Sequence, residues 1–549
     1  MLRCLLFLGL LAVTAMADDI RLIGHGEIWR YLKGTNEPPT ISGAKWFQSV
    51  YNDSDWSNGR SSFGTQGSYA EVTLFPDYAF AYKTVYFRKT FIVNDPLNIA
   101  ELLLRADYDD GLVIYLNGVE VGRRGAPGTS GEPVPVTALA PYHPRGAAEI
   151  ISLTGAIGLL RPGTNTLAVQ LLGFGTPSSD FNMAFNAELL ANVIRGPYIQ
   201  NNTSNSAQII WQTYSPVRAE VEFGTNVATT QRLLVSTNAT NHVATLTQLL
   251  PDTPYFYRVV NHFGASRTVA NWNSFRTFKN TGSITFDVMG DSGTGSDGQL
   301  LVADQLKNSQ SDFLMHVGDL VYYAITQQNA DLRMLSVYAE EMQRRPWFLT
   351  VGNHEMYWDT NAALQVFYLP TNSVTGTEHY YSFDHGDVHF AVAWSDLQAR
   401  AAYHPGSPQY EWLDADLARS TKPWKFLFFH HVWRSSSYHQ IDDYDLNQVL
   451  DTAQLDEGLA GLARKHGVQI IFNGHDHCYE RLAPDGGPIS FVSGGGGATP
   501  YLFAAPHTDS VQFHNAYHFL RVTVEGDEAQ VEAVGTDGAA FDRVHIRRT

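Results

Sequence analysis

Five short apolar segments in the second half of the chain are each followed at once by polar side chains, and this pattern constrains the fold more than any other feature. The segments have the length of buried strands and span 284–289, 313–317, 347–351, 426–429 and 468–472. Segments with helical spacing lie between them, at 332–344, 410–419 and 455–465. Strands that alternate with helices in this way predict βαβ units and a layered α/β domain.

The residues that follow these strands have the side chains that bind metal ions. In chain order they are Gly290-Asp291-Ser292-Gly293, Gly318-Asp319-Leu320-Val321-Tyr322, Gly352-Asn353-His354-Glu355, His430-His431 and Gly474-His475-Asp476-His477. A single Gly-Asp turn or His pair is more often structural, but five such blocks at strand ends converge on one edge of an α/β sheet. A carboxylate can bridge two cations while imidazoles and a carboxamide complete each shell. The pattern predicts a two-metal hydrolase, and two metals suit the hydrolysis of phosphate esters.

The first half of the chain has the signals of β structure. Residues 84–91 and 111–116 alternate as strands, and the second run leads into Asn117-Gly118, a strong hairpin signal. We therefore predict a β-sandwich over 18–193. Residues 207–212 and 219–223 also alternate with period two, and about 85 residues suffice for one small sandwich, which we place at 194–279.

Charge and hydropathy limit the partners and the location. Fifty-five acidic against 37 basic residues give a net charge of -18, which disfavours nucleic-acid binding. An apolar run at 5–13 follows Arg3 and ends in Ala15-Met16-Ala17, which is typical of a secretory signal peptide at 1–17. The run is too short to span a membrane, and no other stretch reaches that length. We expect a secreted or periplasmic protein without a membrane span.

The five blocks, in this order and with Tyr322 three residues after Asp319, resemble the metallophosphoesterase superfamily and specifically the purple acid phosphatases. The resemblance implies a calcineurin-like catalytic domain at 280–549, with layers in the order α/β/β/α. Residues 194–279 resemble the fibronectin type III-like domain that precedes such catalytic domains. Residues 18–193 resemble galactose-binding-like modules, on Trp46, Asp55-Trp56, Tyr86-Phe87-Arg88 and Tyr115-Leu116-Asn117-Gly118. The expected fold is thus two β-sandwiches followed by an α/β metallophosphoesterase domain.

The resemblance also implies roles for individual residues. It places a ferric ion among Asp291, Asp319, Tyr322 and His477, with Asp319 bridging to a second, divalent metal (Zn, Fe or Mn) held by Asn353, His430 and His475. His431 remains an alternative to its neighbour His430. His354 is the expected proton donor to the leaving group. His439 matches a substrate-contacting histidine of plant members, although Gln440 departs from their pattern and a plain surface histidine is the alternative.

The implied activity is that of an exported acid phosphatase, which hydrolyses small phosphate monoesters by attack of metal-bound hydroxide. Two alternatives stay open. One is a phosphodiesterase that uses the same metals. The other is a carbohydrate-adhesion protein whose phosphatase domain is secondary, with glycan or cell-surface contact through the N-terminal sandwich. None of the five blocks lies within 18–193, so that segment is expected to be dispensable for hydrolysis of small substrates.

Overall fold

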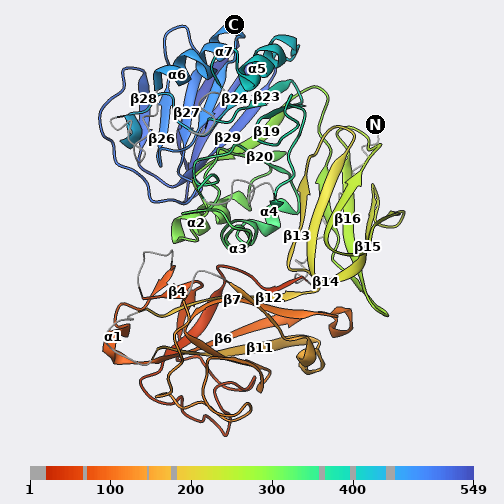
Figure 1. The fold of residues 1–549 in the computed structure, drawn as a ribbon, viewed down its shortest axis with the longest axis vertical. Coiled ribbons are helices and arrows are strands. Elements are labelled where there is room, and N and C mark those ends of the chain that lie inside the picture. The colour runs from red at the N-terminus through yellow and green to blue at the C-terminus, as the bar shows by residue number, and fades with distance from the viewer. Residues whose placement is uncertain are drawn as a thin grey trace, which may run out of the picture.

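The computed structural model describes residues 20–65, 71–144, 148–174, 182–357, 365–395, 403–440 and 452–548. Three regions follow one another along the chain: an N-terminal sandwich at the bottom of Figure 1, a second β region at the right, and a C-terminal α/β region at the upper left. The predicted signal peptide at 1–17 lies outside the described residues. Within the described ranges, no helix has both the length and the apolar character needed to cross a bilayer.

The N-terminal sandwich consists of two six-stranded sheets. One has the order β10-β7-β12-β4-β5, with β1 paired to β12, and the other has the order β3-β2-β6-β11-β8-β9. The first sheet contains β1 (Arg21–Ile23), β4 (Phe63–Gly64), β5 (Thr73–Leu74), β7 (Leu102–Asp109), β10 (Glu149–Ser152) and β12 (Ala184–Ala191). The second contains β2 (Ile28–Lys33), β3 (Ser57–Arg60), β6 (Thr84–Val93), β8 (Gly111–Leu116), β9 (Val119–Arg124) and β11 (Gly163–Leu172). Three short helices join strands: α1 (Tyr78–Ala81), η2 (Pro96–Asn98) and η3 (Thr154–Leu159).

The local signals of this region explain its strands. The two alternating runs predicted from the sequence form β6 and β8, and their apolar side chains meet those of the facing sheet in one core. Asn117 and Gly118 join β8 to β9 with φ angles of 50° and 92°. Positive φ at both central residues is the requirement of the turn that suits a two-residue hairpin, and Asn-Gly meets it at low cost.

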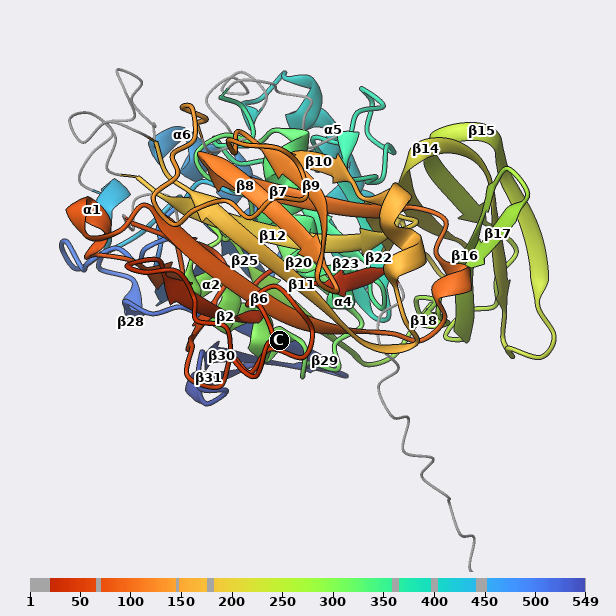
Figure 2. The same cartoon turned by 90° about the horizontal axis from the view of Figure 1, so that it is seen from below.

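The second β region is a six-stranded sheet. Its strands are β13 (Arg195–Gln200), β14 (Ala207–Gly224), β15 (Gln231–Leu246), β16 (Pro254–Phe263), β17 (Ser266–Val269) and β18 (Asn273–Arg276). One long strand, β14, pairs with three others, β13, β15 and β16. The two alternating runs predicted as separate strands are both parts of β14, whose register shifts after Gln212. Both halves of β14 contribute to one core, through Trp211 and Val221. Figure 2 shows this region beside the N-terminal sandwich. The domain boundaries at 193/194 and 279/280 stay predictions.

The C-terminal α/β region contains two more sheets. A six-stranded sheet has the order β21-β20-β19-β29-β30-β31, and a seven-stranded sheet has the order β22-β23-β24-β25-β27-β26-β28. The first consists of β19 (Ile284–Met289), β20 (Phe313–His316), β21 (Trp347–Leu349), β29 (His518–Glu525), β30 (Glu528–Gly535) and β31 (Ala540–Arg547). The second consists of β22 (Tyr381–His385), β23 (Val388–Val392), β24 (Trp424–Phe428), β25 (Ile470–Asn473), β26 (Tyr479–Leu482), β27 (Ile489–Ser493) and β28 (Ser510–His514).

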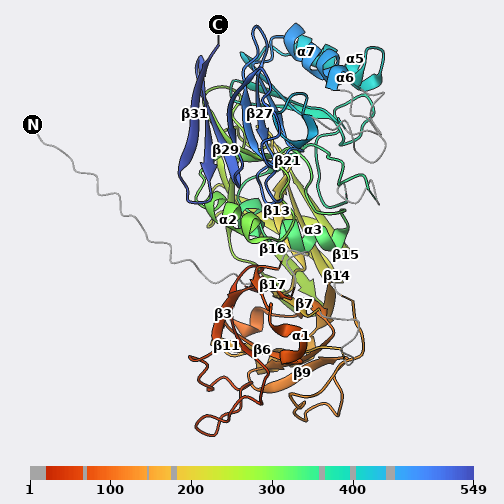
Figure 3. The same cartoon turned by 90° about the vertical axis from the view of Figure 1, so that its left-hand side faces the viewer.

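Helices cover the outer faces of these two sheets, and phenylalanines fill the space between them. Phe286 of β19 packs against Phe390, Phe426 and Phe472 of the other sheet. On the side of the seven-stranded sheet lie α5 (Pro408–Arg419), α6 (Thr452–Glu457) and α7 (Leu459–Lys465) (Figure 3). On the side of the six-stranded sheet lie α2 (Asp297–Leu306), α3 (Gln327–Ala330), the π-helical turn η4 (Asp331–Leu335) and α4 (Ala339–Met342). The layers are therefore α/β/β/α, as the resemblance implies.

The five strands that precede the predicted ligands are divided between the two sheets. β19, β20 and β21 are parallel neighbours in one sheet, and β24 and β25 are parallel neighbours in the other. The single helix expected at 332–344 is instead η4 and α4, separated by a turn. Because strand pairing is a long-range property, the apolar runs reveal the strands but not this division. The polar blocks meet where the two sheets place their carboxyl ends together.

Candidate metal centre

The backbone at three of the strand ends adopts a conformation that is uncommon for residues with side chains. Asp291, Asp319 and His475 have φ angles of 58°, 54° and 67°, in the left-handed region. Each follows a glycine, and the space beside that glycine is occupied: a Cβ on Gly474 would lie 2.6 Å from Asp291 Oδ2. Conformations of this kind cost about 1–3 kcal/mol each and gather at functional sites.

One cluster forms around the phenol of Tyr322. Its hydroxyl oxygen lies 3.0 Å from Asp291 Oδ1, 3.2 Å from Asp319 Oδ2 and 2.9 Å from His477 Nε2. All four side chains are buried. A single hydroxyl proton can serve only one of these three neighbours in a linear hydrogen bond, so the cluster has more acceptors than donors.

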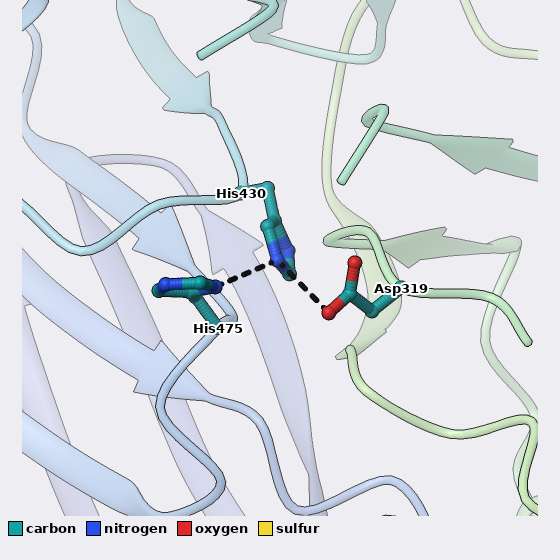
Figure 4. A group of neighbouring side chains, drawn as sticks. All are labelled: Asp319, His430 and His475. Carbon is teal, nitrogen blue, oxygen red and sulfur yellow. Dashed lines mark hydrogen bonds and ion pairs between the residues drawn. The ribbon is translucent and has the colours of Figure 1, made fainter. Parts of the chain in front are cut away.

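A second cluster forms around the imidazole of His430, which lies between Asp319 and His475 (Figure 4). His430 Nε2 lies 3.3 Å from Asp319 Oδ2, 3.1 Å from Asn353 Oδ1 and 3.2 Å from His475 Nδ1. Ligand atoms of Asp319, His430 and His475 all lie within 4.8 Å of one another. Asp319 Oδ2 belongs to both clusters, so the seven predicted ligands meet in two groups that share one carboxylate oxygen.

Hydrogen bonds outside the clusters orient the ligand atoms inward. His430 Nδ1 lies 2.7 Å from Val317 O, and His477 Nδ1 lies 3.0 Å from Thr499 O. A carbonyl oxygen only accepts, so in each imidazole Nδ1 carries a proton and Nε2 faces the cluster. The Asn353 amide nitrogen donates to the Tyr357 hydroxyl at 3.1 Å, which directs its oxygen toward His430. Outer contacts of this kind hold metal ligands in place.

Burial and mutual charge shift the pKa values of these groups strongly. Burial raises the pKa of Asp291 well above its usual value, and the Asp319 carboxylate adds to the rise. Burial and the carboxylates of Asp291 and Asp319 raise the pKa of Tyr322. Burial by itself would lower the pKa of His430, but the charges of Asp319 and Asp291 raise it to about 10. These shifts hold protons on Asp291, Tyr322 and His430, and a bound cation would displace those protons and favour the deprotonated form of every ligand.

Comparison with known proteins agrees with this chemistry. Residues 284–479, which include all seven ligand candidates, match the model of the calcineurin-like phosphoesterase family. This segment is therefore similar in sequence to calcineurin-like phosphoesterase domains. Purple acid phosphatase 21 of Arabidopsis thaliana is 29% identical over 276 residues, which are 47% of this chain and 58% of that protein. Human acid phosphatase type 7 is 26% identical over 396 residues, which are 62% of this chain and 88% of that protein.

A solved structure has the same fold. Purple acid phosphatase PPD1 from yellow lupin seeds superposes with a TM-score of 0.59 at 18% identity, and the match covers 89% of this chain and 96% of that one. The chain is thus related to purple acid phosphatases in sequence and shares their fold.

Glu355, the last residue of the third block, has a role that the sequence analysis did not assign. Glu355 is buried, and its carboxylate accepts hydrogen bonds from the backbone N–H groups of Asp319 (2.9 Å), Leu320 (2.7 Å) and Gly352 (2.8 Å). Burial and the nearby Asp319 carboxylate raise the pKa of Glu355 to about 7. It fastens the loop after β20 to the loop after β21. The sequence signal for this role was the position of Glu355 directly after Asn353-His354.

His354 lies beside the shared carboxylate. Its Nε2 is 3.8 Å from Asp319 Oδ2, its ring centroid is 4.3 Å from that of Tyr322, and its backbone N–H donates to Asp319 Oδ1 at 3.0 Å. His354 Nδ1 contacts the carbonyl oxygen of Tyr323, so Nε2 is the nitrogen that faces the cluster. The side chain is 14% exposed, which leaves it accessible to a small molecule.

His439 lies at the other side of the site, in the short helix η7 (Tyr438–Gln440). Its ring stacks on His475 with centroids 4.0 Å apart, and its Nδ1 lies 2.6 Å from Asp476 Oδ1. His431, the alternative ligand, directs Nδ1 to Ser395 Oγ at 3.0 Å, outside both clusters. The geometry thus favours His430 as the ligand.

Proposed function

We propose that this chain is an acid phosphatase of the purple acid phosphatase type, which hydrolyses small phosphate monoesters at a two-metal centre. The observation that carries the proposal is the pair of ligand clusters that share Asp319 Oδ2. A carboxylate oxygen common to two groups of acceptors is the arrangement that holds two cations close together. The calcineurin-like phosphoesterase match supports the same reaction class.

The donor types support two different cations. The phenol of Tyr322 and the carboxylate of Asp291 are hard anionic donors once deprotonated, and with His477 they suit Fe(III). Asn353, His430 and His475 offer a carboxamide and two imidazoles, which suit a divalent ion such as Zn(II), Fe(II) or Mn(II). When bound, the two cations would neutralise phosphoryl oxygens and lower the pKa of coordinated water.

We assign the remaining steps to side chains at the edge of the clusters. His354 can hold a proton on Nε2, beside the position where an ester oxygen would leave, and is the proton donor to that oxygen. His439 can contact the phosphate through its second ring nitrogen while Asp476 holds the first. Export belongs to the same proposal and depends on the predicted signal peptide.

The test is to purify the protein, measure its metals and record its visible spectrum. We expect about two metal ions per chain, one of them ferric, and a pink to purple colour from charge transfer between Tyr322 and Fe(III). Tyr322→Phe should lose the colour and keep the fold. Turnover of an aryl phosphate monoester should exceed that of the bis-aryl diester. A colourless wild type with full ferric iron, or a preference for the diester, would contradict the proposal.

A further inference from the structure

One face of the N-terminal sandwich is polar yet largely buried. On β7, Leu104 and Ala106 point into the sandwich core, and Arg105 and Asp107 alternate with them. On β12, Glu188 and Asn186 lie directly opposite Arg105 and Asp107 in the sheet register. These four residues form an outer surface, named here the polar face. Alternation of this kind normally places polar side chains in water, but Glu188 has no exposed surface and Arg105 is 3% exposed.

The segment that covers the polar face belongs to the phosphoesterase region. In Figure 1, β7 and β12 lie next to the helices α2, α3 and α4. Glu188 Oε2 accepts hydrogen bonds from Arg105 Nη1 and from the hydroxyl of Ser336, both at 2.8 Å. Ser336 follows η4 directly. At the start of the same turn, Asp331 accepts two hydrogen bonds from Arg195, at 2.6 and 3.0 Å. The turn is held at both ends by buried charged groups.

The turn also contacts the metal centre. Arg333, within η4, donates from Nη1 to the backbone carbonyl of Tyr322 at 2.5 Å. The backbone carbonyl of Arg333 accepts from the side chain of Gln299 at 2.6 Å. Asp107 of the polar face lies close enough to raise the pKa of Arg333, against the effect of burial, which lowers it. Hydrogen bonds therefore join the N-terminal sandwich to the end of η4 through Ser336, and join η4 to the backbone of Tyr322 through Arg333.

The loop that carries Asp319 and Tyr322 is held at two points. Glu355 binds the backbone N–H groups of Asp319 and Leu320 at its start, and Arg333 binds the carbonyl of Tyr322 at its end. The Tyr322 N–H donates to Gly293 O at 3.0 Å. Because the phenol must meet Asp291, Asp319 and His477 together, a small shift of this backbone would separate the donors of the first cluster.

We propose that the N-terminal sandwich is a positioning element of the metal centre, which holds the Tyr322 loop in place through Arg333. The inference rests on the proposed role of Tyr322 as a metal ligand. It replaces the expectation that 18–193 is dispensable, since removal of this segment would take away Arg105 and Glu188, which both bind the Ser336 hydroxyl. Groups that orient metal ligands typically change metal affinity by about 10–100-fold when they are removed.

The experiment measures binding of Zn²⁺ to chelator-treated full-length protein, by competition with a coloured chelator. Tyr322→Phe identifies the binding step that depends on the phenol. For that step we expect Arg333→Met to weaken affinity about tenfold and Arg333→Lys to restore most of it. Asp107→Asn, which keeps the shape of the side chain and removes its charge, should weaken the same step about threefold.

Arg60→Met is the matched control. Arg60 of the N-terminal sandwich pairs with Asp304 of α2 at 2.9 Å, so it crosses the same interface away from the Tyr322 loop. Its Zn²⁺ affinity should equal that of the wild type. Circular dichroism checks the fold of each variant, and Asp107→Asn remains informative if Arg333→Met fails to fold.

The outcomes separate the two proposals. Suppose that Tyr322→Phe binds Zn²⁺ with wild-type affinity and, after reconstitution with iron, has the visible absorption of the wild type. Tyr322 is then not a metal ligand. If Tyr322→Phe weakens one step but Arg333→Met and Asp107→Asn bind like the wild type, the positioning role is overturned. A loss in Arg333→Met with none in Asp107→Asn would also overturn it, because Arg333 would then act without the N-terminal sandwich.

Discussion

Two buried polar clusters lie on either side of η4, and they differ in the balance of their hydrogen-bonding groups. Where η4 meets the N-terminal sandwich, Glu188 faces Arg105 and Ser336, and where it meets the second β region, Asp331 faces Arg195. Each carboxylate there has donors that match it. In the metal centre, acceptor atoms converge on one hydroxyl and one imidazole nitrogen. A matched cluster needs nothing further, whereas a surplus of buried acceptors is satisfied by added protons or by a cation.

The largest expected effect comes from removal of the acceptor that both metal-binding groups share. Asp319→Asn replaces a bridging carboxylate with a neutral amide, which bridges two cations poorly. We expect turnover to fall about 1,000-fold or more and the content of both metals to drop. Elemental analysis and initial rates on an aryl phosphate measure this.

Asp414→Asn is the control for this change, because Asp414 pairs with Lys465 at the surface of the same region. It should keep both metals and normal turnover. Full metal content together with normal turnover in Asp319→Asn would overturn the two-metal assignment.

The second prediction removes one partner from the cluster in which Glu188 and its hydrogen-bond donors are matched. Glu188→Leu removes the carboxylate 2.8 Å from the buried Arg105, although Asp331 remains 3.7 Å away. Loss of one member of a buried ion pair destabilises a protein by about 3 kcal/mol or more. Denaturant unfolding should show this loss. The double variant Arg105→Met/Glu188→Leu should recover most of it, because two apolar side chains can pack together where the charges were. Equal stability of Glu188→Leu and the wild type would mean that the Glu188–Arg105 ion pair does not stabilise the interface.

The pKa of Glu188 predicts how the interface responds to acid. Burial would raise this pKa, but Arg105 and Arg21 lower it below the usual value for a glutamate. A carboxyl group with a depressed pKa stabilises the fold above its unfolded pKa and loses that contribution as the pH falls through its folded pKa. The interface should therefore stay charged through the mildly acidic range in which an acid phosphatase works.

The sequence revealed the metal centre better than the interface. Asp291, Asp319 and His475 each follow an apolar strand and a glycine, so a local pattern marked these three ligand candidates. The polar face has no such mark, because Glu188 meets Arg105 and Ser336, 83 and 148 residues away. Its alternation with apolar residues is that of an ordinary solvent-facing sheet.

The fold shows the same limit. Strands and helices follow from periodicity, which is a local property of the chain. The division of the five ligand-bearing strands between two sheets depends on pairing across long stretches, as in β19 with β29. The role of Glu355 was missed for a related reason: its three backbone donors belong to two loops that come together only in the folded protein.

The third prediction concerns proton transfer at the edge of the metal centre. His354→Ala should lower turnover of an alkyl phosphate about 100-fold, because a basic leaving oxygen needs a proton. An aryl phosphate with a good leaving group should lose much less, and metal content should stay near normal. Comparison of the two substrates on one preparation measures this. Equal losses for both would remove His354 from the role of proton donor.

The smallest expected effect concerns the pair formed by Asp476 and His439, which shares features with both kinds of cluster. Asp476 is buried and holds His439 Nδ1, which is a matched contact, yet His439 also stacks on the ligand candidate His475. Asp476→Ala frees the His439 ring, so we expect KM to rise about tenfold with little change in kcat, the effect of about one charge-assisted hydrogen bond. Asp476→Asn keeps an acceptor and should recover part of the loss. If Asp476 acts through His439, the double variant Asp476→Ala/His439→Ala should resemble His439→Ala alone. Additive losses, or a loss of metal in Asp476→Ala, would instead mean that Asp476 supports His475 and His477 directly.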